Sequence, residues 1–165
     1  MKSRLLLALL TTLAGGTLAS GPLACGGADV EPRSGTWTYQ GSDIGANTCG
    51  DTVPVYPEGN FKITVGDGSF TVDPLTGEDP FTCSYGGGSF DCPERLAATA
   101  DYPDYMVTVN FKVSTDGTIE SPTELSGSQT ANVDCVGSGC ALALTALNIT
   151  QFPCSYDLTF TAKAQ

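Results

Sequence analysis

The chain has 165 residues, enough for one domain, and its 20 glycines and 10 prolines punctuate runs rich in Thr, Val, Tyr and Phe, a composition typical of antiparallel β structure. Acidic residues number 18 against 7 basic ones, and histidine is absent. Nucleic acid is therefore excluded as a partner, because phosphate binding requires clustered lysine and arginine, and the usual base that activates a catalytic serine or cysteine is missing.

The first 24 residues have the pattern of an export signal. Lys2 and Arg4 precede an apolar run over residues 5–13, and small residues then lead to Leu23-Ala24-Cys25. The apolar run is too short to span a bilayer as a permanent anchor. We therefore predict a signal peptide over residues 1–24.

This start resembles the leader of bacterial lipoproteins, in which the cysteine after the signal peptide becomes the lipidated first residue. The resemblance implies lipidation at Cys25, with Ala24 before it, although Pro22 stands where the family usually has leucine. Gly26 follows the cysteine, which by the family's sorting rule implies the outer membrane of the cell envelope. The protein would then contact the membrane through its N-terminal lipid. The alternative is ordinary signal-peptidase cleavage after Thr17-Leu18-Ala19.

Residues 25–34 are predicted to form a flexible tether, since glycines, a proline and charges offer nothing to bury. The folded domain is then expected over residues 35–165. Loss of the leader also removes Lys2 and Arg4, so that the acidic excess of the exported chain increases. A surface of this charge favours solubility, with cation binding as the lesser alternative.

Cysteine number supports the lipid anchor. Seven cysteines is an odd number for an exported chain. If Cys25 carries the lipid, an even set remains, and in an oxidising compartment six cysteines are expected to form three disulfides. A metal site is a weaker interpretation, because histidine and C-x-x-C pairs are absent, and we predict no cofactor. The remaining cysteines are Cys49, Cys83, Cys92, Cys135, Cys140 and Cys154.

The first strand is expected to begin at Gly35, with Trp37 and Tyr39 on one face. This Gly-x-Trp opening resembles that of lipocalins and related calycin barrels, in which the tryptophan closes one end of the barrel. In that family a basic residue of the last strand packs over the tryptophan, and the resemblance implies this role for Lys163. A core tryptophan in a β-sandwich is the alternative.

A long loop and two hairpins are predicted next. The loop covers Ile44–Asn60, which contains Gly, Asn, Asp and two prolines. Apolar residues then alternate from Phe61 to Val65, and Gly66-Asp67-Gly68 turns the chain into the first hairpin. Gly86-Gly87-Gly88 is the turn of the second hairpin.

The second hairpin also indicates a disulfide. Cys83 and Cys92 lie on its arms at nearly matched distances from the tip, so we expect them to pair. The spacing of the other four cysteines leaves two alternatives open. These are Cys135–Cys140 with Cys49–Cys154, or Cys135–Cys154 with Cys49–Cys140.

A helix and a strand are predicted in the middle of the chain. Glu94–Ala100 (ERLAATA) has a helix-forming composition for about two turns. In Asp104–Thr115 apolar residues occupy every second position, which only a strand sorts onto one face. Val109 and Phe111 are therefore expected in the core. Asp116-Gly117 then suits a tight hairpin turn.

After that turn we expect an irregular segment, a strand, a helix and a final strand. Polar residues and Pro122 indicate an edge strand, a bulge or irregular chain. Alternation then predicts a strand over Gln129–Cys135, and apolar residues at helical spacing predict a short helix over Ala141–Leu147 at one mouth of the barrel. Phe152–Ala162 alternates clearly and should form the last strand.

These runs predict an all-β fold of seven to nine antiparallel strands with one or two short helices. Short turns between sequence neighbours indicate an up-and-down meander that closes into a small barrel. Closure would pair the Trp37 strand with the last strand and remove both sheet edges. The alternative is a two-sheet β-sandwich.

Candidate chemistry rests on carboxylates that are close in sequence. Such pairs can share Ca²⁺ or act as an acid and a base, although paired loop carboxylates are most often simply solvated. We predict no catalytic or metal site among them. The pairs are Glu78-Asp79, Asp91 with Glu94, and Asp101 with Asp104.

Three functions are compatible with these observations. The leading hypothesis is a lipid-anchored binding or structural module of the cell envelope without catalysis, whose protein or small-molecule partner the sequence does not identify. A carrier of a small apolar ligand is the first alternative, and it requires a barrel interior left partly empty. A carboxylate-based hydrolase is the second, and it requires two buried acids that face each other across a cleft.

Overall fold

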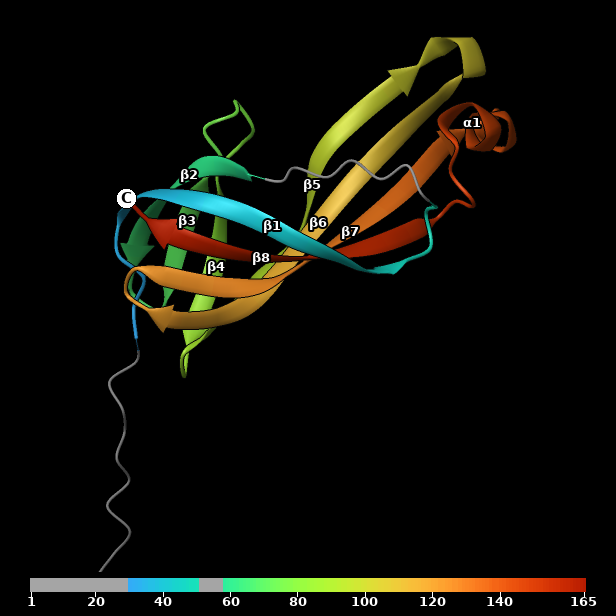
Figure 1. The fold of residues 1–165 in the computed structure, drawn as a ribbon. Coiled ribbons are helices and arrows are strands. Elements are labelled where there is room, and N and C mark those ends of the chain that lie inside the picture. Colours follow the sequence, from blue (N-terminus) through green and yellow to red (C-terminus); the bar gives the residue numbers. More distant parts are fainter. Residues whose placement is uncertain (1–29, 51–57) are drawn as a thin grey trace, which may run out of the picture.

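Eight antiparallel strands follow one another around a closed barrel in the computed structural model, which describes residues 30–50 and 58–165 (Figure 1). Each strand pairs with the next, and β1 pairs with β8 to close the barrel. The predicted meander and barrel are therefore confirmed, and the sandwich alternative is wrong. The strands are β1 (Gly35–Asn47), β2 (Glu58–Gly66), β3 (Ser69–Asp73), β4 (Phe81–Gly86), β5 (Ser89–Tyr102), β6 (Val107–Ser121), β7 (Glu124–Gly137) and β8 (Cys154–Ala164).

The strands differ in length, and this divides the molecule into two parts. β2, β3 and β4 have 9, 5 and 6 residues, whereas β5, β6 and β7 have 14, 15 and 14. The turns at residues 66–69, 86–89 and 121–124 join β2 to β3, β4 to β5 and β6 to β7 at one end of the barrel, and we call this end the closed end. Beyond it, β5 to β8 and the end of β1 continue as an open sheet, the extension (Figure 1).

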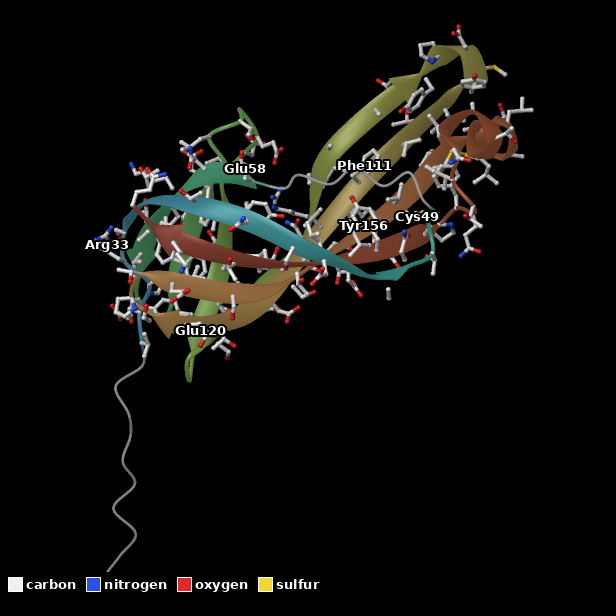
Figure 2. All side chains as sticks on the ribbon, in the orientation of Figure 1. Arg33, Cys49, Glu58, Phe111, Glu120 and Tyr156 are labelled. Carbon is white, nitrogen blue, oxygen red and sulfur yellow. A yellow bond between two sulfur atoms is a disulfide. The ribbon has the colours of Figure 1, made fainter. Side chains whose placement is uncertain are left out.

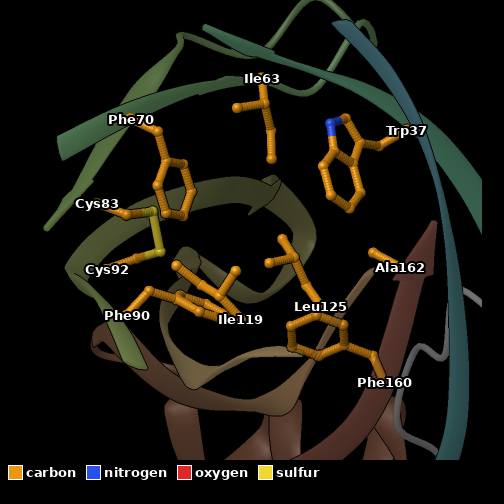
Figure 3. Packing of buried hydrophobic residues seen from close by; sticks show 10 residues of the cluster. All are labelled: Trp37, Ile63, Phe70, Cys83, Phe90, Cys92, Ile119, Leu125, Phe160 and Ala162. Atoms are coloured by element: carbon orange, nitrogen blue, oxygen red, sulfur yellow. A yellow bond between two sulfur atoms is a disulfide. The ribbon is translucent and has the colours of Figure 1, made fainter. Parts of the chain in front are cut away.

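The closed end holds the main hydrophobic core. Trp37, Ile63 and Cys83 are 0% exposed there, and inward-facing residues of the other strands surround them (Figure 3). The alternation predicted for the last strand is confirmed, since every second residue of β8 from Cys154 to Ala162 is buried. The remaining members of this core are Phe70, Phe90, Cys92, Ile119, Leu125, Phe160 and Ala162.

A second cluster covers the inner face of the extension. Val109 is fully buried in it, as predicted, whereas Phe111 is only half-buried because the sheet is open on that side. Figure 2 shows Phe111 and Tyr156 in the extension and Arg33 at the opposite, closed end. The outer face is polar, as the ion pair of 2.6 Å between Lys112 and Asp134 illustrates.

The helix predicted over Glu94–Ala100 is wrong, because these residues belong to β5. They pair with β6 from Cys92 to Tyr102, with register shifts after Cys92 and after Leu96. Helix propensity is a weak preference, and an isolated helix of about two turns is unstable in water. The hydrogen-bonded ladder offered by the long strand β6 therefore determines the structure of this segment.

The turn predicted at Asp116-Gly117 is also wrong. β6 continues through these residues to Ser121, and the turn into β7 contains Pro122 instead. The polar segment after Gly117 is consequently strand rather than an edge or irregular chain, and the predicted bulge alternative agrees with a register shift between Ile119 and Ser121. Pro122 fits a turn because proline has no N–H to donate to a ladder. The strand predicted over Gln129–Cys135 lies within β7.

The predicted short helix is confirmed as α1 (Cys140–Leu147), which ends at Asn148 in a left-handed conformation, but its predicted place at one mouth of the barrel is wrong. It lies at the far end of the extension, against β7 and the 3-10 turn η1 (Pro103–Tyr105) (Figure 1). Within residues 30–50 and 58–165, no helix is long and apolar enough to cross a membrane.

The loop predicted over Ile44–Asn60 is shorter than expected, since β1 runs to Asn47 and β2 starts at Glu58. Residues 51–57 lie outside the described residues. The predicted signal peptide over residues 1–24 and the anchor Cys25 also lie outside them. The last part of the predicted tether is described, and it is packed: Val30 contacts the closed-end core and Pro32 is buried.

Three disulfides connect the six cysteines of the domain. Cys83 pairs with Cys92 across the β4–β5 hairpin, as predicted. The other two bridges follow the first of the two alternatives. Cys135–Cys140 ties the end of β7 to α1, and Cys49–Cys154 joins the end of β1 to the start of β8.

Candidate functional site

A cavity of about 400 Å³ lies inside the barrel, between the closed end and the extension. All eight strands contribute lining residues, most of them apolar. An eight-stranded barrel is just wide enough to be filled by side chains or to hold one small ligand. Here part of the interior is left empty. The strand residues that line it include Tyr39, Phe61, Phe70, Val72, Phe81, Phe90, Thr115, Leu125, Gln129 and Phe160.

Two glycines make room for two of the rings that line the cavity. Gly117 lies opposite Phe90, and Gly127 lies opposite Phe160, in the strand pairing. A Cβ at Gly117 would be 2.8 Å from Phe90 Cε1, and one at Gly127 would be 3.1 Å from Phe160 Cε1. The two rings therefore occupy the space where the glycines lack side chains. Both rings pack into the closed-end core and form part of the cavity wall.

Aromatic contacts hold the rings around the cavity in place. The Phe70 ring lies 5.8 Å from Phe90 in an edge-on arrangement, and Tyr39 lies 5.6 Å from Phe160. Such pairs are worth about 0.5–1.5 kcal/mol beyond the area that they bury. Burial also raises the pKa of Tyr39, so its hydroxyl stays neutral at physiological pH. The cavity wall is thus a preformed, uncharged aromatic surface.

Polar groups gather at the mouth of the cavity, on the side of the extension. The start of β2 contributes Glu58, the loop between β3 and β4 contributes Glu78, and β5 contributes Arg95. Arg95 points into the barrel because it pairs with Val113, which is on the inner face of β6. Its side chain is 22% exposed.

Arg95 makes two contacts at this mouth. Its guanidinium carbon lies 3.9 Å from the centre of the Phe81 ring, and its Nη1 lies 3.6 Å from Glu78 Oε2. Desolvation lowers the pKa of Arg95, and the neighbouring Glu78 partly opposes this effect. Arginine nevertheless stays charged in proteins. The cavity therefore has one partly desolvated cation at its entrance.

Arg95 is a residue of the candidate site that the sequence did not predict. The prediction of a helix over residues 94–100 gave its side chain no defined direction. Strand alternation alone also does not determine whether the Arg95 side chain points inward or outward, because the register shift after Cys92 changes which residues point inward. Basic residues are rare in this chain, which has 7, and this rarity was the available signal.

The predicted carboxylate pairs do not form a site. Glu78 contacts Arg95, Glu94 accepts a hydrogen bond of 2.7 Å from Asn132 Nδ2, and Asp101 accepts one of 2.7 Å from Thr108. In residues 30–50 and 58–165 no charged side chain is buried, and no three acids or cysteines are grouped as metal ligands would be. The remaining members, Asp79, Asp91 and Asp104, are exposed.

Trp37 seals the closed end, as predicted, but the expected contact with Lys163 is wrong. Trp37 lies opposite Ala164, whereas Lys163 lies opposite Thr38 and points outward. Its side chain is 70% exposed, with Nζ 3.1 Å from Glu124 Oε1. The ring N–H of Trp37 instead donates a hydrogen bond of 2.9 Å to the Arg33 carbonyl oxygen.

Comparison of this chain with protein-family models, with curated proteins and with solved structures gives no match. The cavity and its mouth are therefore the basis for assigning a function. They offer an apolar interior of small-molecule size, one cation and two carboxylates at the entrance, and no acid-base pair within the described residues.

Proposed function

We propose that the domain is a non-catalytic binding module that holds a small, largely apolar molecule inside the barrel. The observation that carries this proposal is the cavity of about 400 Å³, whose size and mostly apolar lining are those of small-molecule sites. A barrel filled by its own side chains would have argued against a carrier. The cavity therefore favours the carrier over a purely structural role.

The energetics of such binding are sufficient for a weak to moderate affinity. Each buried methylene contributes about 0.8 kcal/mol, so about ten of them contribute roughly 8 kcal/mol before the cost of lost motion. After a cost of a few kcal/mol, roughly 4–6 kcal/mol remain, so the dissociation constant is expected between about 50 μM and 1 mM. Ligands that also satisfy the polar mouth would bind more tightly.

The hydrolase alternative has less support. A carboxylic acid that donates a proton near neutral pH usually has a pKa raised by burial or by a like-charged neighbour. In the described part of the chain every acid is at least partly exposed, and the three predicted pairs point to different partners. The absence of histidine from the sequence removes another common base.

The proposal includes a lipid anchor at Cys25 in the outer membrane. Arg33 N–H donates a hydrogen bond of 2.7 Å to the Pro122 carbonyl oxygen, so the chain enters the domain at the closed end. The mouth lies on the opposite side, near Glu58 (Figure 2). With an anchor before Val30, the cavity would open away from the membrane, and the ligand would be exchanged with the aqueous side.

A dye-binding experiment tests the proposal. The exported protein with Cys25→Ser, which lacks the lipid, is titrated with the neutral apolar dye N-phenylnaphthylamine. Val72→Trp fills the cavity, and we expect it to weaken dye binding by about tenfold or more. Thr71→Trp is the matched control, because the preceding residue of β3 points outward and should leave the affinity unchanged. Equal binding by both variants, or no binding by the parent protein, would contradict the proposal.

A further inference from the structure

The charged residues at the cavity mouth are arranged asymmetrically. Among the described lining residues Arg95 is the sole base, and it lies deeper than the two carboxylates: its side chain is 22% exposed, against 43% for Glu78. Glu58 at the start of β2 is exposed as well. An incoming ligand therefore meets the cation Arg95 beside the apolar interior.

Few of the donors of Arg95 are used. A guanidinium has five N–H donors in a planar fork. The closest described carboxylate oxygen is 3.6 Å from Nη1, longer than a normal hydrogen bond, and Phe81 contacts the face of the group rather than its edge. Stacking on a ring fixes the plane and leaves the edge donors available. The fork is thus positioned for oxygen atoms that the ligand would bring.

The partial desolvation of the Arg95 guanidinium also favours an anionic ligand. Removing a charged group from water is costly unless hydrogen bonds compensate for the lost hydration. Arg95 packs on the Phe81 ring, and its nearest carboxylate oxygen, on Glu78, lies 3.6 Å away, so close hydrogen bonds to an acceptor do not compensate its guanidinium. An anionic ligand group would supply closer hydrogen-bond acceptors than Glu78 does.

We propose that Arg95 binds the oxyanion head group of an amphipathic ligand whose apolar chain occupies the barrel. The inference rests on the proposed function and names the ligand class for that cavity. A carboxylate or a phosphate monoester matches the planar fork of arginine through two parallel hydrogen bonds. The apolar chain then extends along the aromatic wall between Phe90 and Phe160.

Glu78 is the competitor for this interaction. It lies on the loop between β3 and β4, and its carboxylate occupies the position next to Nη1 that a ligand oxygen would take. Binding of an anion requires Glu78 to move aside or to share the guanidinium. Glu78 therefore lowers the affinity for anions and protects the charge of Arg95 when the cavity is empty.

Ligands with the same alkyl chain and different head groups test the head-group proposal separately from the cavity proposal. The experiment measures displacement of the neutral dye from the exported Cys25→Ser protein at low ionic strength. The competing ligands are decanoate, decyl phosphate, decanol and decylammonium. We expect decanoate or decyl phosphate to bind about tenfold more tightly than decanol, as a charge-assisted hydrogen-bonded pair allows. The tighter of the two anions identifies the head group. Decylammonium should bind more weakly than decanol.

Substitutions then assign the preference to Arg95. Arg95→Met keeps the bulk of the side chain, and it should abolish the preference for the anion, so that the ratio of the anion affinity to the decanol affinity falls to about one. Lys112→Met is the matched control, because it removes an ion-paired cation of the same β-sheet from the outer face. Glu78→Gln, on an exposed loop where folding is not at risk, should raise the affinity for the anion by about three- to tenfold.

The outcomes distinguish the two proposals. Equal binding of the anions and decanol, or tighter binding of decylammonium, overturns the role of Arg95 and leaves the cavity function intact. Failure of every ligand and of the dye to bind overturns the proposed function itself. Should Arg95→Met fail to fold by circular dichroism, an unchanged anion affinity in Glu78→Gln would still contradict the inference.

Discussion

Gly117 of β6 lies directly opposite Gly127 of β7, and neither residue could carry a side chain in this structure. A Cβ at Gly117 would collide with the Ser126 carbonyl oxygen, and a Cβ at Gly127 would collide with the Asp116 carbonyl oxygen. The two glycines let the strands approach closely at the point where the barrel passes into the extension. They also leave room for the rings of Phe90 and Phe160, and so determine the shape of the cavity.

Gly117→Ala is expected to destabilise the domain by about 1–3 kcal/mol or more, because the new methyl group overlaps backbone atoms that cannot move independently. Urea unfolding measures the change in the free energy of unfolding. Gly86→Ala is the control, since a Cβ there has no atom within 4 Å. Equal stability of the two variants would show that the strands are not closely packed at Gly117.

The disulfide Cys49–Cys154 should stabilise the domain more than Cys83–Cys92 does. The first closes a sequence separation of 105 residues and the second a separation of 9. In the loop-entropy model this difference corresponds to about 2 kcal/mol. Paired cysteine-to-alanine variants, compared by urea unfolding, measure it. A greater loss on removing Cys83–Cys92 would contradict the expectation.

Phe111→Ala should cost about 2 kcal/mol, less than the ~3–5 kcal/mol of a fully buried phenylalanine, because the ring is only partly buried on the open face of the extension. Asn110→Ala, on the opposite face of β6, should cost less than about 0.5 kcal/mol. Thermal unfolding of the two variants provides the comparison. A loss from Asn110→Ala as large as that from Phe111→Ala would reverse the assignment of the faces.

Lys163→Ala should change stability by less than about 1 kcal/mol, because the side chain is 70% exposed and its ion pair with Glu124 is at the surface. Trp37→Ala should cost about 3–5 kcal/mol, since the indole is fully buried at the closed end. Unfolding in guanidinium chloride tests both. A severe effect of Lys163→Ala would indicate a contact with the core that this structure does not contain.

The lipoprotein resemblance predicts that the exported protein begins at Cys25 and carries lipid there. Mass spectrometry of the membrane fraction measures the N-terminal peptide and its modification. Cys25→Ser should release the protein from the membrane, because the anchor then has no attachment point. An unmodified N-terminus at Ser20 would favour the alternative cleavage site after Ala19.

The sequence determined those features that depend on near neighbours in the chain. Alternation in β6 and β8 predicted strands and their buried faces, and the glycines of residues 66–68 and 86–88 predicted two hairpins. The hairpin also predicted Cys83–Cys92, because the two positions are brought together by a turn a few residues away. In each case the determining contacts are local.

Only the tertiary structure decided the features that depend on register and closure. Closure of β1 against β8 brings Cys49 to Cys154, which spacing alone could not select. A shift of one residue in pairing moves a side chain to the other face, so register turned Lys163 outward and Arg95 inward. The cavity likewise depends on rings from β5 and β8 lying over glycines of β6 and β7. These contacts join residues far apart in the chain, and no local pattern records which of them form.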